Sequence, residues 1–573
     1  MTPQRSFVLL AAPVLAAALL IPAATARPAP APPFAKGMVS AADPRAAEAG
    51  VQMLRAGGSA TDAAIATMLA LTVVEPQSSG IGGGGLYLAT AGDGRVVTID
   101  GREKAPAAAT EQWFIRDGKV MNFADAVPGA TSVGVPGNVA LAAVAHKARG
   151  KLPWARLFTP AIKLAQGGFL VTPRLHDMLV GSAATAAFSP AGKALFYDAN
   201  GTAKAVGTRI VNRDLAQTLR AIAAQGPRAF YDGANRRGLV ATVNTAARNP
   251  SPMTEADLGA YQAKERDPVC GNYRAYRICG MGPPSSGATT VFATLKQLER
   301  FDLTALGKDS PTAWHLIAES MRLAYADRAR YSGDADFVPV PVAGLTDPDY
   351  LAKRSALIAA DRTMSTVAAG VPRGAEALVL ADPAPQDEHG TSHFVAVDRR
   401  GNAVSYTSTI ESSFGSGLMT GGYFLNNELT DFDMNPVLEG KPANNRVQGG
   451  KRPRSSMSPT LVFGPDGKLR LAVGAAGGVT IPAQVIRAVI GVIDWNLPVQ
   501  QALALPVIFA PGTDAVYVEQ GSTLEAMIPA LQALGHASVT ARGLPLKANA
   551  IEVIGGKLAG ATDPRSEGRA VSE

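Results

Sequence analysis

Two β-rich runs in the second half of the chain, 391–398 and 403–410, flank a glycine-containing turn at 399–402. Such runs on either side of a short turn predict an antiparallel β-hairpin. If the turn is centred near residue 400, Thr391 lies opposite Thr409 at the open end of the hairpin. Facing residues in a hairpin have Cβ atoms about 4.5–5.5 Å apart. The pattern therefore predicts two hydroxyl groups side by side.

Threonine pairs are also common in strands without any function, so this hairpin alone does not indicate a site. Three further features favour a functional site. Arg102 lies at the end of an early predicted hairpin, and Ser455 and Ser456 are adjacent serines. A predicted strand at 469–473 leads into glycines 474, 477 and 478 and then into a helix from Pro482. Glycine amides at a helix N-terminus can stabilise an oxyanion or hold a phosphate. No P-loop lysine accompanies these glycines.

An earlier glycine run, 80–85, invites a nucleotide-binding interpretation. A dinucleotide fingerprint follows a strand and opens a helix. This run instead follows a predicted helix, capped by Ser59, and precedes a predicted strand at 86–90. Its order therefore favours tight backbone packing near a site. A separate helix, N-terminal to the one capped by Ser59, is predicted to begin at Asp43-Pro44 and to end at Gly57-Gly58.

The overall composition is that of a globular protein. The chain has 573 residues, 47% hydrophobic and 18% charged, which excludes a disordered chain, a fibre and a multi-span membrane protein. The net charge is +7, and the densest basic cluster is Lys451, Arg452 and Arg454. No basic helix or aromatic ladder accompanies it, so we interpret the charge as solvated surface and expect no nucleic-acid partner.

Residues 1–26 have the pattern of a secretory signal peptide. Arg5 precedes an apolar run at 7–21, and Ala24-Thr25-Ala26 offers small residues for cleavage. The alternative is a membrane anchor, but about 15 apolar residues are short for a bilayer span. We expect a mature protein that starts near Arg27, is periplasmic or secreted, and has no membrane attachment after signal removal.

Cys270 and Cys279 are the two cysteines of the chain, and the residues between them could form a hairpin. A disulfide between them is plausible in an oxidising compartment. Two sulfurs without a nearby histidine do not provide the four ligands of a structural zinc site. We therefore expect a structural role for the cysteines, free or bridged, and no metal.

The chain resembles a known protein family. The stretch from Thr391 to Gly415 resembles, almost residue for residue, the signature of the γ-glutamyltranspeptidases, which belong to the N-terminal-nucleophile hydrolase superfamily. Further family-like stretches lie at 75–85, 134–137, 283–287, 425–428 and 563–565. The resemblance covers nearly the whole mature chain. It implies an α+β fold, the four-layer αββα sandwich of that superfamily.

The resemblance also implies self-processing between Gly390 and Thr391. The products would be a large subunit, 27–390, and a small subunit, 391–573, in one intertwined fold. The new α-amine of Thr391, with an ordinary pKa of about 7.7–8.0, is a suitable general base for its own hydroxyl. Thr409 would hydrogen-bond the nucleophile, and Gly477 and Gly478 would form the oxyanion hole. His393 is interpreted as fixing local structure rather than as a triad member.

By the same likeness, the substrate is a γ-linked glutamate, with glutathione as the expected donor and no cofactor. Arg102, Ser455 and Ser456 would bind its α-carboxylate, since an arginine fork suits a carboxylate. Glu411, Glu428 and Asp431 would bind its α-ammonium. A γ-glutamyl ester on Thr391 would be resolved by water or by the amine of an amino acid or peptide.

Two departures from the family pattern and three alternatives stay open. The stretch 432–454 is somewhat short for a lid loop, which would favour hydrolysis, and Val395 replaces a small hydroxyl residue, which could slow self-cleavage. The first alternative is an acylase for a related side chain such as glutaryl-cephalosporin, against which the ammonium-binding acids argue. The second is an uncleaved periplasmic γ-glutamyl-binding protein. A nucleotide-binding protein ranks third.

Overall fold

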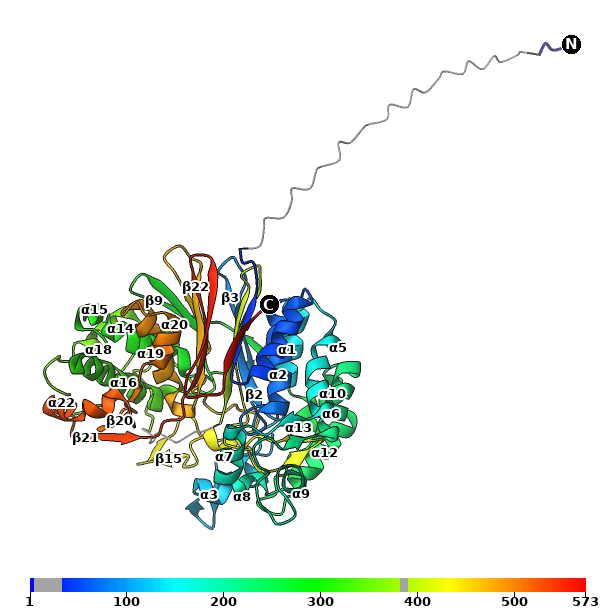
Figure 1. Cartoon of the computed structure of the whole chain (residues 1–573), viewed down its shortest axis with the longest axis horizontal. Coiled ribbons are helices and arrows are strands. Elements are labelled where there is room, and N and C mark those ends of the chain that lie inside the picture. The colour runs from blue at the N-terminus through cyan, green and yellow to red at the C-terminus, as the bar shows by residue number, and fades with distance from the viewer. Residues whose placement is uncertain (5–32, 382–389) are drawn as a thin grey trace. The chain divides into compact units, whose positions relative to one another are not determined.

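Two antiparallel β-sheets face each other at the centre of the part of the chain from Pro33 to Glu573 (Figure 1). In the computed structural model, the described residues are 1–4, 33–381 and 390–573. The predicted signal peptide therefore lies almost wholly outside the described residues. Among the described residues, no helix is both long and apolar enough to cross a membrane.

The first sheet contains at its centre the predicted hairpin at 391–410, here called the nucleophile hairpin. Its strand order is β24 (Arg569–Ser572), β1 (Met38–Ala41), β11 (Ser392–Val397), β12 (Ala403–Thr409), β2 (Gly84–Thr90), β3 (Val96–Gly101) and β8 (Lys264–Arg266). The second sheet has the order β23 (Lys557–Thr562), β22 (Lys547–Ile554), β18 (Leu469–Ala476), β17 (Thr460–Phe463), β10 (Tyr276–Gly280) and β9 (Val269–Tyr273). Both sheets combine strands from before and after Gly390.

Helices cover the outer face of each sheet (Figure 1). Helices α1 (Pro44–Arg55) and α2 (Ala60–Val74) pack on the first sheet, against β1, β11 and β12. Helices α14 (Gly287–Leu298) and α19 (Ile481–Ile493) pack on the second sheet, and α16 (Pro311–Tyr331) packs on α14. This order of layers is the predicted αββα sandwich.

The helix boundaries follow from the capping residues that the sequence offers. Asp43 caps α1 by accepting a hydrogen bond from the Arg45 amide, with Pro44 at the first helical position. Ser59 and Asp62 form a reciprocal capping box at the start of α2. Asn212 caps α10 (Arg213–Gln225) by accepting a hydrogen bond from the Leu215 amide.

Apolar side chains fill the space between the two sheets. Val395 and Leu88 of the first sheet pack with Phe463, Ala472 and Ile551 of the second, all of them buried. Burial of this kind stabilises the fold by about 25 cal/mol for each Å² of apolar surface removed from water. The packing holds the nucleophile hairpin rigidly against the facing sheet.

The basic cluster at 451–454 corrects one prediction. Lys451, Arg452 and Arg454 are buried rather than solvated. The Lys451 ammonium donates to two main-chain carbonyls, Arg452 lies 3.1 Å from Asp100, and Arg454 lies 3.4 Å from Asp433. Acids and carbonyls distant in the sequence compensate these charges, so local composition could not reveal their burial.

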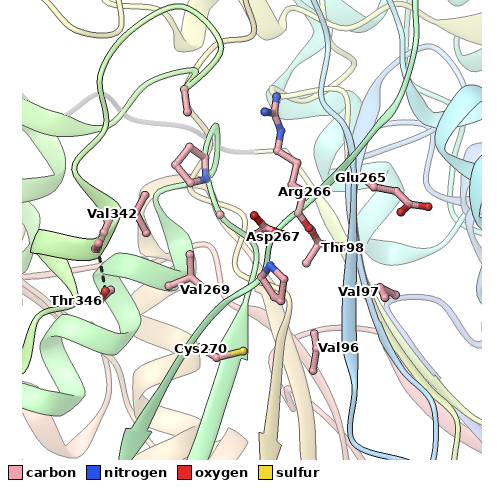
Figure 2. Close-up of a pocket in the computed structure, with 15 residues that line it drawn as sticks. Val96, Val97, Thr98, Glu265, Arg266, Asp267, Val269, Cys270, Val342 and Thr346 are labelled. Carbon is pink, nitrogen blue, oxygen red and sulfur yellow. Dashed lines mark hydrogen bonds between the residues drawn. The ribbon is translucent and has the colours of Figure 1, made fainter.

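An open surface hollow of about 800 Å³ lies beside the outer strands β8 and β9 (Figure 2). Val96, Val97 and Thr98 of β3 line it together with Arg266 and Cys270. The Arg266 guanidinium is already paired with Asp100 and Asp336 at 2.9 Å each. None of the residues predicted to react with substrate or bind it lines this hollow, so it is separate from the candidate site.

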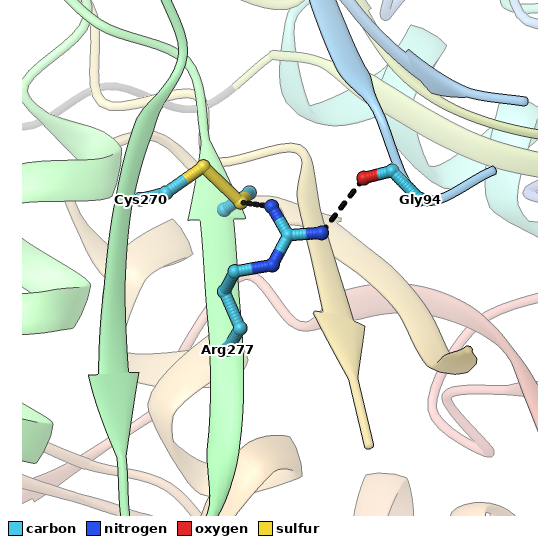
Figure 3. The surroundings of a disulfide bond; sticks show 4 residues. Gly94, Cys270 and Arg277 are labelled. Atoms are coloured by element: carbon cyan, nitrogen blue, oxygen red, sulfur yellow. Dashed lines mark hydrogen bonds between the residues drawn. A yellow bond between two sulfur atoms is a disulfide. The ribbon is translucent and has the colours of Figure 1, made fainter. Parts of the chain in front are cut away.

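Cys270 and Cys279 form a disulfide between the paired strands β9 and β10 (Figure 3). The two residues face each other in the ladder, and the hairpin predicted between them is confirmed. Arg277 on β10 donates to the Gly94 carbonyl at 2.7 Å and to the Cys279 sulfur at 3.5 Å (Figure 3). The disulfide therefore reinforces an outer edge of the second sheet.

We expect the double substitution Cys270→Ser/Cys279→Ser to lower the free energy of unfolding by about 2–3 kcal/mol, because the bridge closes a short loop. Catalytic constants should stay within about twofold of the wild type, since the bridge lines the hollow beside β9 rather than the candidate site. Urea denaturation and steady-state kinetics of the oxidised wild type and the variant measure both. A large loss of activity at unchanged stability would contradict this structural role.

Candidate active site

The nucleophile hairpin has the predicted register. Ser392 pairs with Ser408 and Val397 with Ala403. The Thr391 hydroxyl donates to the Thr409 hydroxyl at 3.2 Å, and the Glu411 amide donates to the Thr409 hydroxyl at 2.8 Å. The hairpin thus brings two buried hydroxyl groups together, with one oriented by a main-chain amide.

The residue before Thr391 is tightly enclosed. A Cβ atom on Gly390 would lie 1.9 Å from the Glu411 carbonyl oxygen, so a side chain does not fit there. The Gly390 carbonyl accepts a hydrogen bond from the Thr391 hydroxyl and lies 3.5 Å from that of Thr409. The Gly390–Thr391 peptide bond is therefore held beside both hydroxyl groups.

A glycine turn ends β18 and begins the short helix that leads into α19. Gly477 has φ 127° and Gly478 has φ 57°, which L-residues with side chains rarely adopt. A Cβ atom on Gly477 would lie 2.1 Å from the Pro545 carbonyl oxygen. The Thr480 hydroxyl donates to the Gly477 carbonyl at 2.8 Å and fixes the turn.

Contacts between the sheets place this turn at the same end of the sandwich as Thr391. Ala476, the last residue of β18, pairs with Lys547 on β22. The Lys547 ammonium lies 3.4 Å from the hydroxyl of Ser392, the residue after Thr391. The turn at Gly477 directly follows Ala476, so it lies at the same end of the sandwich as the hydroxyl pair.

His393 lies between the sheets. Its Nδ1 is 2.8 Å from the Thr407 hydroxyl, and its ring packs directly under Gly474. Burial lowers the pKa of His393 to about 3, so the imidazole is neutral at physiological pH. These contacts fix local structure across the sandwich.

A buried cluster of charges lies beside the hairpin. The Arg102 guanidinium contacts the carboxylates of Glu428 and Asp431 and lies 3.9 Å from Glu103. It also donates to the main-chain carbonyls of Pro453 and Arg454, at 3.3 and 2.8 Å. The sequence assigned Arg102 and the two acids to opposite ends of a ligand. The structure joins them in one ion-pair cluster, since buried charges require compensation.

Burial shifts the titration of these acids. Burial raises the pKa of Glu103 to about 7, against the pull of Arg102. Burial also raises the pKa values of Glu428 and Asp431, again opposed by Arg102. These acids therefore hold their protons more tightly than exposed carboxyl groups do, because burial and neighbouring carboxylates penalise their charged forms.

The remaining predicted pocket residues lie on neighbouring segments. Glu411 adopts φ 74°, and its carboxylate accepts hydrogen bonds from the Ser412 and Asn427 side chains. The Ser456 hydroxyl accepts from Arg328 at 2.5 Å. The Ser455 hydroxyl accepts from the Met457 amide at 3.2 Å. Ser456 is therefore linked to α16 through Arg328.

Sequence reasoning missed Arg328. This arginine on α16 donates to Ser286 at 2.9 Å as well as to Ser456. An arginine on the buried side of a helix is itself a signal, because buried arginines are rare unless paired. Among the described residues, no group of three or more histidine, cysteine or acidic side chains could hold a metal ion.

Comparisons with known proteins agree with this geometry. The sequence model described as gamma-glutamyltranspeptidase matches residues 46–572. The chain belongs to the γ-glutamyltranspeptidase family. It is 38% identical over 516 residues to the glutathione hydrolase proenzyme of Bacillus subtilis strain 168, covering 87% of this chain and 85% of that one.

Two further relatives of this chain carry acylase names. The acylase ACY 1 proenzyme of Pseudomonas sp. strain V22 is 37% identical over 546 residues, covering 94% of this chain and 93% of that one. The crystal structure of cephalosporin acylase from Bacillus halodurans superimposes with a TM-score of 0.80 at 27% identity, over 97% of this chain and 99% of that one. The fold is therefore that of the N-terminal-nucleophile hydrolases.

The stretch 432–454, predicted to be short for a lid loop, contains a two-stranded hairpin, β15 (Val437–Leu438) with β16 (Lys441–Pro442). Arg446 anchors the segment through Glu111 at 2.6 Å. Arg454 at its end pairs with Asp433 at its start. The short stretch is thus tied down at both ends.

The buried acids predict a pH effect on stability. The pKa of Glu103 is about 7 in the folded protein, against an ordinary 4.5, so the folded state binds more protons between these values. The free energy of unfolding should therefore fall as pH rises from about 4.5 to about 7. Glu103→Gln should flatten this slope, and the exposed-site control Glu48→Gln should not. Urea denaturation at several pH values measures the slopes, and identical slopes for Glu103→Gln and the wild type would contradict the assignment.

Proposed function

We propose that this protein is a self-processing γ-glutamyl hydrolase and transferase that acts on glutathione and other γ-glutamyl amides through an ester on Thr391. The observation that carries the proposal is the hydrogen-bonded pair of Thr391 and Thr409, enclosed beside Gly390 and at the same end of the sandwich as the Gly477 turn. Family membership supports the same chemistry.

Self-processing would use the contacts around Gly390. The Thr391 hydroxyl attacks the Gly390 carbonyl carbon, the peptide C–N bond breaks, and the former amide nitrogen takes a proton. Water then hydrolyses the resulting ester and leaves Gly390 with a carboxylate and Thr391 with a free α-amine. Thr409 stabilises the attacking hydroxyl, and Gly390 permits the close approach because it lacks a side chain.

Turnover would use the new α-amine as general base. It takes the Thr391 hydroxyl proton as the oxygen attacks the γ-carbonyl carbon, and it returns the proton to the leaving amine. The amides of Gly477 and Gly478 stabilise the tetrahedral oxyanion; removal of one such donor typically costs about 10²–10³-fold in rate. Water or an amino-acid or peptide amine then releases the γ-glutamyl group.

Recognition of the glutamyl head would divide the charge cluster. The substrate α-carboxylate approaches Arg102, Ser455 and Ser456, while its α-ammonium approaches the acids. Glu411, Glu428 and Asp431 provide that acidic side. Ion pairs between the substrate and the cluster thus replace some of the ion pairs that Arg102 makes with the acids in the absence of substrate.

Intact mass measurement with N-terminal sequencing tests the processing step. Two chains, the smaller beginning at Thr391 and ending at Glu573, together with hydrolysis of a γ-glutamyl anilide, are the expected result. The same measurement reports whether residues 1–26 are removed, as export to the periplasm or medium requires. One uncut chain that is inert toward the anilide would contradict the proposal and favour a binding protein.

The acylase-named relatives justify one competing substrate, a glutaryl amide. Glutaryl has a carboxylate but no α-ammonium, so it cannot engage the acids at Glu411, Glu428 and Asp431. We expect kcat/KM for a γ-glutamyl anilide to exceed that for the matched glutaryl anilide by at least about 100-fold, since unpaired buried charges are costly. The reverse preference would indicate an acylase.

A further inference from the structure

A buried ion pair lies directly behind the nucleophile strand. The Lys547 ammonium is 3.0 Å from Glu75, and both side chains are at most 4% exposed. The same ammonium lies 3.2 Å from the Ser78 hydroxyl and 3.4 Å from that of Ser392. Ser392, next to Thr391, also donates its hydroxyl hydrogen bond to Glu75 at 2.5 Å.

This cluster holds both strands that present the hydroxyl pair. Glu75 fixes Ser392 on β11, and the Ser78 carbonyl accepts from the Ile410 amide at 3.3 Å, just after Thr409 on β12. Ser392, which follows Thr391, and Ile410, which follows Thr409, are thus both held by the turn at 75–78. Lys547 clamps that turn by contacting Glu75 and Ser78 together.

The main chain of Lys547 is tied to the glycine turn. Lys547 pairs with Ala476 in the β18–β22 ladder, and its amide donates to the Gln484 side chain at 3.1 Å. Gln484 in turn donates to the Ala476 carbonyl at 2.7 Å, immediately before Gly477. One residue therefore links the amide donors of the turn to the strand that carries the nucleophile.

We propose that Lys547, paired with Glu75, is a positioning residue that fixes the distance between the Thr391 hydroxyl and the Gly477–Gly478 turn. The inference rests on the proposed function, because it concerns the reaction at Thr391. A displacement of about 1 Å between nucleophile and oxyanion donors can cost about 10²-fold in rate. An ion pair that served stability alone would not need contacts both to the strand that carries Thr391 and to the strand that leads into the glycine turn.

The electrostatic environment supports a fixed ion pair. Burial and nearby Arg174 lower the pKa of Lys547 to about 8, opposed by Glu75. Burial would raise the pKa of Glu75, but Lys547, Arg174 and the Ser392 hydrogen bond together hold it below its ordinary value. Arg174 lies 4.0 Å from Glu75, and Asp43 adds a further negative charge. The two partners therefore keep each other charged.

The test compares Lys547→Met/Glu75→Gln with the wild type. The double substitution removes both charges, so no uncompensated buried ion remains to unfold the protein. We expect kcat for a γ-glutamyl anilide to fall about 10- to 100-fold while KM stays within about twofold. The single variant Lys547→Met should show the same kcat loss.

Arg470→Met is the matched control. Arg470 on β18 pairs with Glu552 on β22, the same two strands, but at the end away from Gly477. It should lower the thermal midpoint without changing kcat. An unchanged kcat in Lys547→Met/Glu75→Gln, or an equal kcat loss in Arg470→Met, would overturn the positioning role alone. A wild type that is inert toward the anilide would overturn the proposed function and this inference with it.

Discussion

Thr391→Ala should yield a single uncut chain that lacks measurable γ-glutamyl hydrolysis. The substitution removes the hydroxyl that lies 3.2 Å from Thr409 and beside the Gly390 carbonyl, so neither the precursor bond nor a substrate carbonyl has a nucleophile. Loss of a nucleophile typically lowers kcat by at least about 10⁴-fold. Denaturing electrophoresis with intact mass reports the cleavage, and release of anilide reports turnover.

Thr391→Ser is the matched control for this loss. It retains the oxygen and removes one methyl group, so it should still cleave after Gly390 and retain activity within about 10- to 100-fold of the wild type. Folding of Thr391→Ala is checked by its thermal unfolding, which should remain a cooperative transition. Full activity in Thr391→Ala would exclude Thr391 as nucleophile.

The elements that the sequence predicted well are those determined by neighbours along the chain. The hairpin register follows from the turn near residue 400, and it places Thr391 beside Thr409 without reference to any other segment. The helix starts at Asp43 and Ser59 likewise depend on side chains within three residues. Local hydrogen bonds of this kind are encoded locally and can be inferred locally.

The residues that the sequence did not reveal depend on partners far away in the chain. Lys547 and Glu75 are separated by 472 positions; Glu75 begins the family-like stretch 75–85, but Lys547 lies in none of the stretches that the sequence singled out. The sequence predicted a surface charge at Arg452 because its partner, Asp100, lies far away in the chain on β3. The sequence reveals the sign of a side chain's charge. Whether that charge is solvated or is compensated by a buried partner depends on the tertiary structure.

Arg102 illustrates both kinds of information. Its place at the end of the predicted hairpin and its likeness to the family marked it as a binding residue. Its contact with Glu428 and Asp431 appears in the three-dimensional structure alone. The acids predicted to bind an ammonium group are thus held by the cation predicted to bind a carboxylate. This coupling gives Arg102 a role in stability beside the role in recognition that the family likeness predicts.

We therefore expect Arg102→Met to lower the free energy of unfolding by about 3–5 kcal/mol near pH 8, because it leaves buried carboxylates without a cation. The same change should lower kcat/KM for a γ-glutamyl anilide by at least about 100-fold, mainly through KM, because the substrate carboxylate loses its charged partner. The stability defect should shrink below about pH 5, since protonated acids need no cation. Urea denaturation at pH 5 and 8 and steady-state kinetics measure these effects.

Arg452→Met separates recognition from stability. Arg452 is as deeply buried as Arg102 and pairs with Asp100, so its loss should also destabilise the fold, but it should leave KM within about twofold because Asp100 is outside the predicted pocket. Arg102→Lys should fall between the wild type and Arg102→Met, because an ammonium cannot contact both carboxylates as a guanidinium fork does. If Arg102→Met raised KM no more than Arg452→Met, the cluster would be structural and the substrate carboxylate would bind elsewhere.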